Sequence, residues 1–200
     1  MLGWWAHGER KGPDVKIAVV GRGSGGGGLA DLWEGAGHEV MRIGREGGDV
    51  SDADAVVLAV PGEAMANALD NVRGIEGKTL IDTTNLQGVV SPEGFPSNAE
   101  YVKSRTNGPT AKSFNTNSAS LYGRLGEANS TPSNLWCGDE EARGVVERLN
   151  RDAGFEPLHA GPLANAARAG SASHGQSHSK HLRRHGSPVP LYRFAPPDRL

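Results

Sequence analysis

The sequence has only one cysteine, Cys137, in 200 residues, so no disulfide can form within the chain. A single thiol is typical of a reducing compartment. No run of apolar residues approaches the roughly eighteen that a membrane-spanning helix needs. The first fifteen residues also lack the apolar core of a secretory signal. These absences lead us to expect a cytoplasmic protein.

The sequence also lacks a large excess of either charge, since 21 Lys and Arg against 23 Asp and Glu leave a formal net charge of −2. Nucleic-acid-binding domains usually carry a basic excess, so no nucleic-acid partner is expected. What the chain does contain is glycine, with 29 residues, which predicts many turns. Its length is enough for one domain with a sizeable core.

The most informative stretch is an apolar run followed by a glycine-rich turn. Residues 16–20 predict a strand, and a helical pattern over 24–36 begins inside the glycines. Gly21, Gly23 and Gly26 have the spacing of a dinucleotide-binding turn. Their roles there would be to permit the tight turn, to let a pyrophosphate approach the backbone, and to let the helix pack on the strand. The alternative is a purely structural turn.

The end of the next predicted strand, 39–43, bears on the choice between NAD and NADP. An NAD site carries an acid there for the ribose 2′-hydroxyl, whereas an NADP site carries a small residue and a cation for the 2′-phosphate. Gly44 is small, and Arg42 and Arg45 offer guanidinium groups that can bind a phosphate. Glu46 argues against this interpretation, and Arg45 could equally be a solvated loop charge. We favour NADP.

Further apolar stretches alternate with helical patterns; they lie at 55–60, 79–83, 111–115, 134–137 and 155–158. This alternation predicts an α/β fold, a Rossmann-type doubly wound and mostly parallel sheet, with a short C-terminal extension that we expect to be disordered. We expect a flexible leader at 1–14, the dinucleotide-binding domain at 15–165 and an atypical tail at 166–200.

Asn85 and Asn115 follow two of these strands, and Val60 and Pro61 end another. The carboxyl ends of parallel strands share one edge of the sheet, so we expect these residues near the glycine turn. An asparagine there could bind a nicotinamide amide or a ribose, or it could simply cap a turn. The sequence leaves both interpretations of Asn85 open.

Several motifs occur in a recognisable order: Gly21–Ala30, Ala36–Val40, Gly44–Arg45, Leu58–Pro61, Ile81–Asn85, Lys112–Thr116, Cys137–Asp139, Asp152–Phe155 and Ala160–Leu163. Together they resemble the deazaflavin (coenzyme F-420)-dependent NADP reductase family and its short bacterial dinucleotide-binding relatives. The resemblance covers about residues 15–165.

The resemblance implies hydride transfer between NADPH and a deazaflavin or flavin-like small-molecule acceptor, and a homodimer. Matching by motif implies contacts in four groups: Arg22, Gly23, Ser24 and Gly25 to the pyrophosphate, Gly44 and Arg45 to the 2′-phosphate, Val60 and Pro61 to the nicotinamide ribose, and Asn85, Asn115 and Thr116 to the reacting ring, as positioning groups only.

The chain departs from the family pattern at two places. Gly25 stands where an apolar residue would pack against the sheet. Residues 168–186 are polar where the family continues with an apolar helix, and matching flanks around this block are consistent with a compensated reading-frame slip. The altered tail keeps a second hypothesis open, a non-catalytic NADP-binding module.

A third hypothesis, a reductase of imines or similar carbonyl-like substrates, needs a proton donor that we do not find in the sequence. The histidines of the tail share helical spacing but lack an accompanying carboxylate or cysteine; they are His174, His178, His181 and His185. We therefore expect no metal site.

Overall fold

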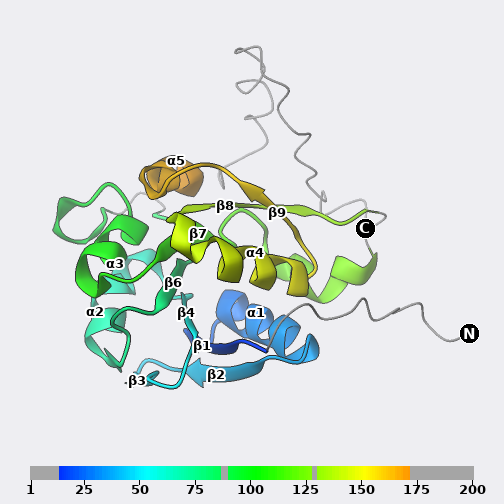
Figure 1. Cartoon of the computed structure of the whole chain (residues 1–200), viewed down its shortest axis with the longest axis horizontal. Coiled ribbons are helices and arrows are strands. Elements are labelled where there is room, and N and C mark those ends of the chain that lie inside the picture. The colour runs from blue at the N-terminus through cyan, green and yellow to red at the C-terminus, as the bar shows by residue number, and fades with distance from the viewer. Residues whose placement is uncertain (1–13, 87–89, 128–129, 172–200) are drawn as a thin grey trace, which may run out of the picture.

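The computed structural model describes residues 14–86, 90–127 and 130–171 (Figure 1). The predicted leader, apart from Asp14, and the four tail histidines lie outside these residues. Seven strands form the main sheet: β1 (Lys16–Val20), β2 (Glu39–Ile43), β4 (Ala55–Leu58), β6 (Thr79–Asp82), β7 (Thr110–Ser113), β8 (Ser133–Gly138) and β9 (Glu156–His159). The strand order is β2-β1-β4-β6-β7-β8-β9.

Every neighbouring pair in this sheet is parallel except β7 and β8. The mostly parallel, doubly wound α/β fold is thus confirmed. A second sheet joins two short strands that the sequence did not predict, β3 (Gly48–Asp49) and β5 (Val72–Arg73).

Helices cover both faces of the sheet (Figure 1). The α-helices are α1 (Ser24–Gly35), α2 (Met65–Asp70), α3 (Asn98–Thr106), α4 (Arg143–Asp152) and α5 (Ala166–Ser171). Short 3-10 helices complete the description: η1 (Gly62–Ala64), η2 (Pro92–Gly94), η3 (Ala119–Glu127), η4 (Glu140–Ala142) and η5 (Leu163–Asn165).

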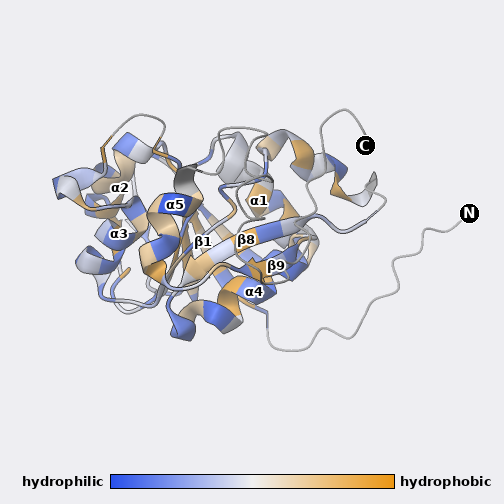
Figure 2. Ribbon diagram, turned by 90° about the horizontal axis from the view of Figure 1, so that it is seen from above, coloured by the Kyte–Doolittle hydropathy of each residue, from blue (hydrophilic) through white to orange (hydrophobic). Residues whose placement is uncertain are grey.

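Side chains alternate along the central strands between two hydrophobic cores. Ile17 and Val19 of β1 pack with α1 and α4, whereas Ala18 and Val20 pack with α2 and α3. Successive residues of a strand point to opposite faces, so a strand covered on both sides is apolar without alternation. Figure 2 shows this as hydrophobic strands between helices that carry residues of both kinds.

Part of the glycine run of α1 lies in a crowded environment, at Gly26 and Gly28, whereas Gly25 and Gly27 have room. Gly28 faces η3, where an added Cβ would lie 2.8 Å from Cδ2 of Tyr122. One turn further along α1, Trp33 is fully buried, donates from Nε1 to the Leu149 carbonyl at 2.9 Å, and meets Phe114 edge-on with ring centroids 5.4 Å apart. Packing of this kind stabilises a helix whose intrinsic propensity is low.

Three polar side chains have structural roles. Ser97 caps α3 by accepting from the Glu100 N–H at 3.2 Å. His38 is structural, since Nδ1 accepts from the Val15 N–H at 3.1 Å and Nε2 lies 2.8 Å from Asp152. Asp139 precedes η4 but its side chain does not cap that helix, and it accepts from Lys103 Nζ at 2.7 Å.

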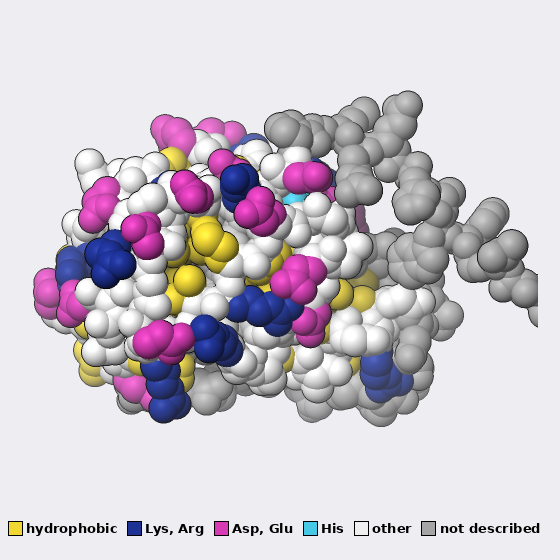
Figure 3. Space-filling view, turned by 90° about the horizontal axis from the view of Figure 1, so that it is seen from below, with side chains coloured by type: hydrophobic (Ala, Val, Ile, Leu, Met, Phe, Trp, Pro, Cys, Tyr) yellow, Lys and Arg dark blue, Asp and Glu magenta, His cyan; other side chains and the backbone are white. Residues whose placement is uncertain are grey.

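None of the helices in the described part of the chain has the length and apolar character needed to cross a bilayer. On the face shown in Figure 3, basic and acidic side chains are interspersed. That mixture agrees with the near-zero net charge.

Candidate functional site

The carboxyl ends of β1, β2, β4, β6 and β7 lie at one edge of the sheet because these strands are mutually parallel. The loops that leave them, together with the first turn of α1, contain every site residue that the sequence predicts.

The β1–α1 turn depends on two glycines. Gly21 has a φ of +114°, and a Cβ there would lie 2.2 Å from the Ala59 carbonyl oxygen, so the position admits glycine alone. Gly26, in the first turn of α1, faces Gly21, and its Cβ would lie 2.2 Å from the Gly21 oxygen. These contacts bring the start of α1 directly onto the end of β1, as predicted for Gly21 and Gly26.

The amino-terminal end of α1 is open to a ligand. Gly23 is the N-cap residue, and no side chain caps the helix. A Cβ added to Gly23 or Gly25 would meet no atom within 4 Å. The first-turn N–H groups, starting with that of Ser24, lack partners within the helix and favour an anion. Gly25 leaves empty the space where an apolar residue was expected to pack, yet α1 forms.

The Arg22 side chain extends from this turn to the carboxyl end of β2. Its Nε and Nη2 donate to the Arg42 carbonyl at 3.3 and 3.2 Å, and Nη2 donates to Glu46 Oε1 at 2.8 Å. Only the backbone of Arg22 stays at the turn. Its guanidinium therefore lies beside Gly44 and Glu46.

The two arginines considered for the 2′-phosphate have different surroundings. Arg42 is bound to α1 through Asp31 at 2.6 Å and Glu34 at 2.8 Å. The hydrogen bonds that its guanidinium donates to Glu34 and Asp31 raise its pKa further above the ordinary value. Arg45 is exposed and makes no hydrogen bond or ion pair with the described residues. Arg45 is thus available to a ligand, whereas Arg42 is committed to helix packing.

Asn85, which follows β6, and Asn115, which follows β7, bind each other through their side-chain amides. Asn85 Nδ2 donates to the Asn115 carbonyl at 2.9 Å, and Asn115 Nδ2 donates to Asn85 Oδ1 at 3.1 Å. Asn115 Nδ2 also donates to the Ala169 carbonyl of α5 at 3.0 Å. The strands thus bring together two of the three predicted ring-facing residues. The third, Thr116, lies next to them and donates to Asn134 Oδ1 at 3.4 Å.

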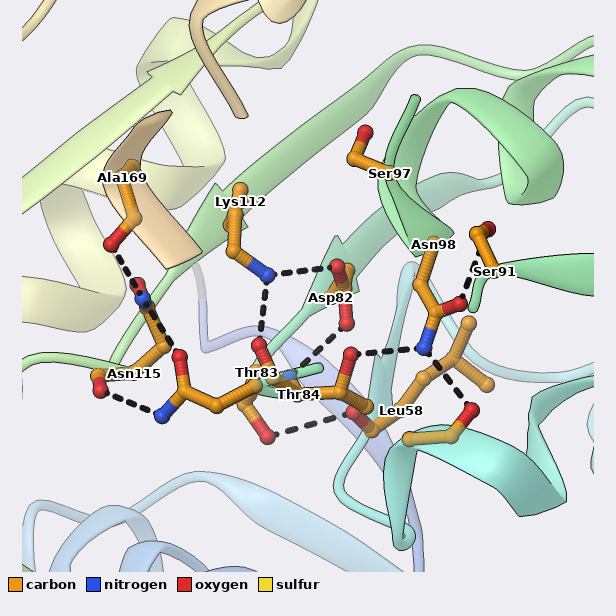
Figure 4. Close-up of polar contacts among 12 residues, drawn as sticks. Leu58, Asp82, Thr83, Thr84, Ser91, Ser97, Asn98, Lys112, Asn115 and Ala169 are labelled. Atoms are coloured by element: carbon orange, nitrogen blue, oxygen red, sulfur yellow. Dashed lines mark hydrogen bonds and ion pairs between the residues drawn. The ribbon is translucent and has the colours of Figure 1, made fainter. Parts of the chain in front are cut away.

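A buried ion pair supports this pair of amides. Lys112 of β7 donates from Nζ to Asp82 Oδ2 at 2.8 Å and to the Thr84 carbonyl at 2.6 Å (Figure 4). Asp82 is completely buried, and its Oδ1 accepts from the Thr84 N–H at 2.8 Å. Asn98 of α3 donates to Thr84 Oγ1 at 2.9 Å. Thr84 is therefore fixed on three sides, which sets the position of Asn85.

Val60 and Pro61 continue from β4 toward the same loops. Val60 packs partly against the core under α2, and Pro61 is exposed before η1. The next residue, Gly62, lies against the β6 loop, because its Cβ would come to 3.0 Å from the Asn85 carbonyl oxygen. The loops after β4, β6 and β7 are thus in direct contact.

Sequence reasoning did not assign roles to Lys112, Asp82 or Phe114. A charged residue within each of two predicted strands, beside apolar neighbours, was the available signal for the first two. Phe114 has a φ of +58°, rare for a residue with a side chain, and turns the chain between β7 and Asn115. No feature of the sequence indicates this conformation. In it, the buried Phe114 ring meets Trp33 and Phe155 edge-on.

The remaining titratable groups near the core are not reactive. Burial raises the pKa of the Cys137 thiol to about 11, so it stays protonated at neutral pH, as expected for a buried structural thiol. Burial likewise raises the pKa of Tyr122 to about 12. The described residues contain no cluster of histidine, cysteine and acidic side chains that could hold a metal ion.

Comparison with known proteins shows similarity at the level of the fold. No family model and no curated protein sequence matches the chain. Among solved structures, a candidate F-420-dependent NADP reductase from Arthrobacter sp. FB24 aligns with a TM-score of 0.64 at 22% identity, over 79% of this chain and 90% of that one. A hypothetical protein from Sinorhizobium meliloti aligns at 0.59 and 21% identity, over 77% and 88%.

Larger enzymes have the same fold over part of their length. An imine reductase from Pseudomonas sp. aligns with a TM-score of 0.60 at 15% identity, over 80% of this chain and 60% of that one. A reductive aminase from Aspergillus terreus, in complex with NADPH and ethyl levulinate, aligns at 0.59 and 16% identity, over 80% and 60%. This chain thus spans about three fifths of these two enzymes.

Proposed function

We propose that this protein binds NADP(H) and transfers a hydride between it and a small-molecule acceptor of the deazaflavin or flavin type. The observation that carries the proposal is the pairing of an uncapped α1 N-terminus with two guanidinium groups at the end of β2. In a Rossmann fold these two places receive the pyrophosphate and the adenosine ribose. The solved structures with the same fold include NADPH complexes.

Each part of the edge has a role in this proposal. Backbone N–H groups from Gly23 to Gly26 bind the diphosphate, for which Gly23 and Gly25 leave room. Arg22 and Arg45 bind the 2′-phosphate above Gly44. Val60 and Pro61 lie under the nicotinamide ribose.

The nicotinamide supplies the hydride chemistry, and the protein supplies orientation and exclusion of water. Asn85, Asn115 and Thr116 carry no charge, so they position groups and do not exchange protons. Transfer to a deazaflavin or flavin ring requires no acid or base from the protein. This fits an edge where the titratable pair Lys112–Asp82 is buried and already hydrogen-bonded.

The test of the proposal is a substitution that blocks the ligand without disturbing the fold. Gly23 has an extended backbone that any residue can adopt, and open space at its Cβ, so Gly23→Val should fold normally. Its side chain would occupy the diphosphate position. Gly144→Val is the matched control, since Gly144 also faces open space but lies on α4.

Calorimetry with NADPH should then show binding by the wild type and by Gly144→Val, and a loss of at least about tenfold in Gly23→Val. Equal affinities in all three proteins would contradict the assigned diphosphate site. Oxidation of NADPH by a deazaflavin, FMN or a quinone would next be measured with the wild type. Turnover supports the reductase, whereas tight binding with no turnover supports a non-catalytic NADP-binding module.

A further inference from the structure

The Glu46 carboxylate lies where an anion would meet Arg22. Its Oε1 accepts from Arg22 Nη2 at 2.8 Å. The same carboxylate folds back over Gly44, because a Cβ on Gly44 would lie 2.4 Å from Oε2 and 2.6 Å from Oε1. The small residue and the guanidinium that would receive a 2′-phosphate are thus both covered by one acidic side chain.

The backbone that carries Glu46 is fixed, but its side chain is free to rotate. The Gly47 N–H donates to the Gly44 carbonyl at 3.2 Å and closes a four-residue turn. Gly47 has a φ of +74° and is packed against the Asn71 carbonyl, which fixes the turn. In contrast, the Glu46 and Arg22 side chains are 65% and 58% exposed, and an ion pair in water at this exposure is weak.

We propose that Glu46 is an internal competitor for the 2′-phosphate and sets the preference between NADP(H) and NAD(H). This inference rests on the proposed function. The carboxylate and the phosphate are both anions that bind the same guanidinium group, so a 2′-phosphate binds Arg22 only after Glu46 has rotated away. NADH has no 2′-phosphate and leaves the Arg22–Glu46 pair in place. Glu46 therefore lowers the affinity for NADPH and leaves that for NADH nearly unchanged.

The test compares Glu46→Gln with Glu39→Gln. Glu39 lies at the opposite end of β2, is 67% exposed and is also paired with a basic residue, Lys16, at 3.8 Å. Calorimetry would measure the dissociation constants of NADPH and NADH at one ionic strength for the wild type and both variants. We expect Glu46→Gln to bind NADPH about five to ten times more tightly than the wild type, with NADH changed by less than about twofold. Glu39→Gln should change neither.

Three outcomes would overturn the inference, and only one of them would also overturn the proposed dinucleotide site. If Glu46→Gln weakens NADH about tenfold and leaves NADPH unchanged, Glu46 accepts from the ribose hydroxyls and the site prefers NAD(H). If it changes neither affinity, Glu46 is a solvated surface charge. In both cases the dinucleotide site itself stands. If neither dinucleotide binds to any of the three proteins, the proposed function fails together with this inference.

Discussion

Gly26 of α1 lies so close to Gly21 that a Cβ on Gly26 would come within 2.2 Å of the Gly21 carbonyl oxygen and 3.0 Å of the Ala59 Cβ. Both Gly21 and Gly26 are therefore required by packing, before any ligand is considered. Their neighbour Gly27 is different, since its Cβ would meet only the Arg22 carbonyl oxygen, at an ordinary contact distance of 3.6 Å.

We predict opposite effects of alanine at these two helix positions. Gly26→Ala should destabilise the fold by about 2 kcal/mol, because backbone must move to admit the methyl group. Gly27→Ala should stabilise it by about 0.5–1 kcal/mol, because alanine is the better helix former and has room. Urea unfolding of both variants, with unchanged m-values, measures the two effects. Similar destabilisation by both would show that the helix start is not packed as described.

The buried pair of Lys112 and Asp82 makes a second prediction. Lys112→Met should destabilise the protein by about 3–5 kcal/mol, because it leaves the Asp82 carboxylate buried without a counter-charge. Adding Asp82→Asn should recover part of this loss, since an amide oxygen can still accept from the Thr84 N–H. Chemical denaturation of the single and double variants tests the pair. A double variant no more stable than Lys112→Met would show that the missing counter-charge is not the cause.

Alkaline pH should weaken the fold through two groups whose pKa is raised by burial. The pKa of Cys137 rises from 9.0 to about 11, so between these values the unfolded chain loses this proton and the native protein keeps it. Stability is therefore complete below pH 9 and falls as pH rises toward 11, by about 2 kcal/mol from this thiol. Tyr122, with its pKa raised from 10.0 to about 12, acts in the same direction at higher pH.

The variant Cys137→Ala isolates the contribution of the thiol. Urea midpoints measured from pH 8 to pH 11 should fall less steeply for Cys137→Ala than for the wild type. Parallel curves would mean that the thiol ionises equally in both states. Lys112 and the other basic groups are common to both proteins and cancel in this comparison.

The side-chain amides of Asn85 and Asn115, which follow β6 and β7, give a prediction about turnover. Asn115→Ala removes the bonds to Asn85 and to the Ala169 carbonyl. If these amides orient the nicotinamide, kcat with a deazaflavin should fall about tenfold while the dissociation constant of NADPH changes little. The opposite result, a large loss of NADPH affinity with unchanged kcat, would assign Asn115 to binding alone.

Most of the sheet could be predicted because its central strands, such as β1 and β4, are buried on both faces and are therefore apolar almost throughout. Residues 16–20 and 39–43 were predicted with the bounds that β1 and β2 have. The grouping of Asn85 and Asn115 at one edge followed from parallel topology, before any contact between them was known. The β3–β5 sheet and η3 were not predicted, since two-residue strands and 3-10 helices depend on tertiary contacts more than on local pattern.

Side-chain partners were harder to predict than elements. Asp139 is of a residue type that often caps helices and it precedes η4, but its side chain accepts from Lys103 and from the Thr110 N–H. These partners are distant in sequence, so no local pattern predicts them. Arg42 and Arg45 looked equivalent in sequence, yet only Arg42 points toward the acidic residues of α1. The partner of a guanidinium group depends on which acidic side chains the tertiary structure brings near it. Spacing along the chain does not predict those neighbours.

The different surroundings of these two arginines lead to the last prediction. Arg45→Ala should lower the affinity for NADPH about tenfold and the affinity for NADH by less than about twofold, since only NADPH carries the 2′-phosphate. Arg42→Ala should leave this preference unchanged and lower stability by about 1 kcal/mol, because it breaks partly exposed ion pairs with Asp31 and Glu34. Calorimetry and urea unfolding of both variants separate the two roles. Equal losses of NADPH and NADH in Arg45→Ala would remove Arg45 from the phosphate site, and a changed preference in Arg42→Ala would show that its guanidinium leaves α1 to meet the ligand.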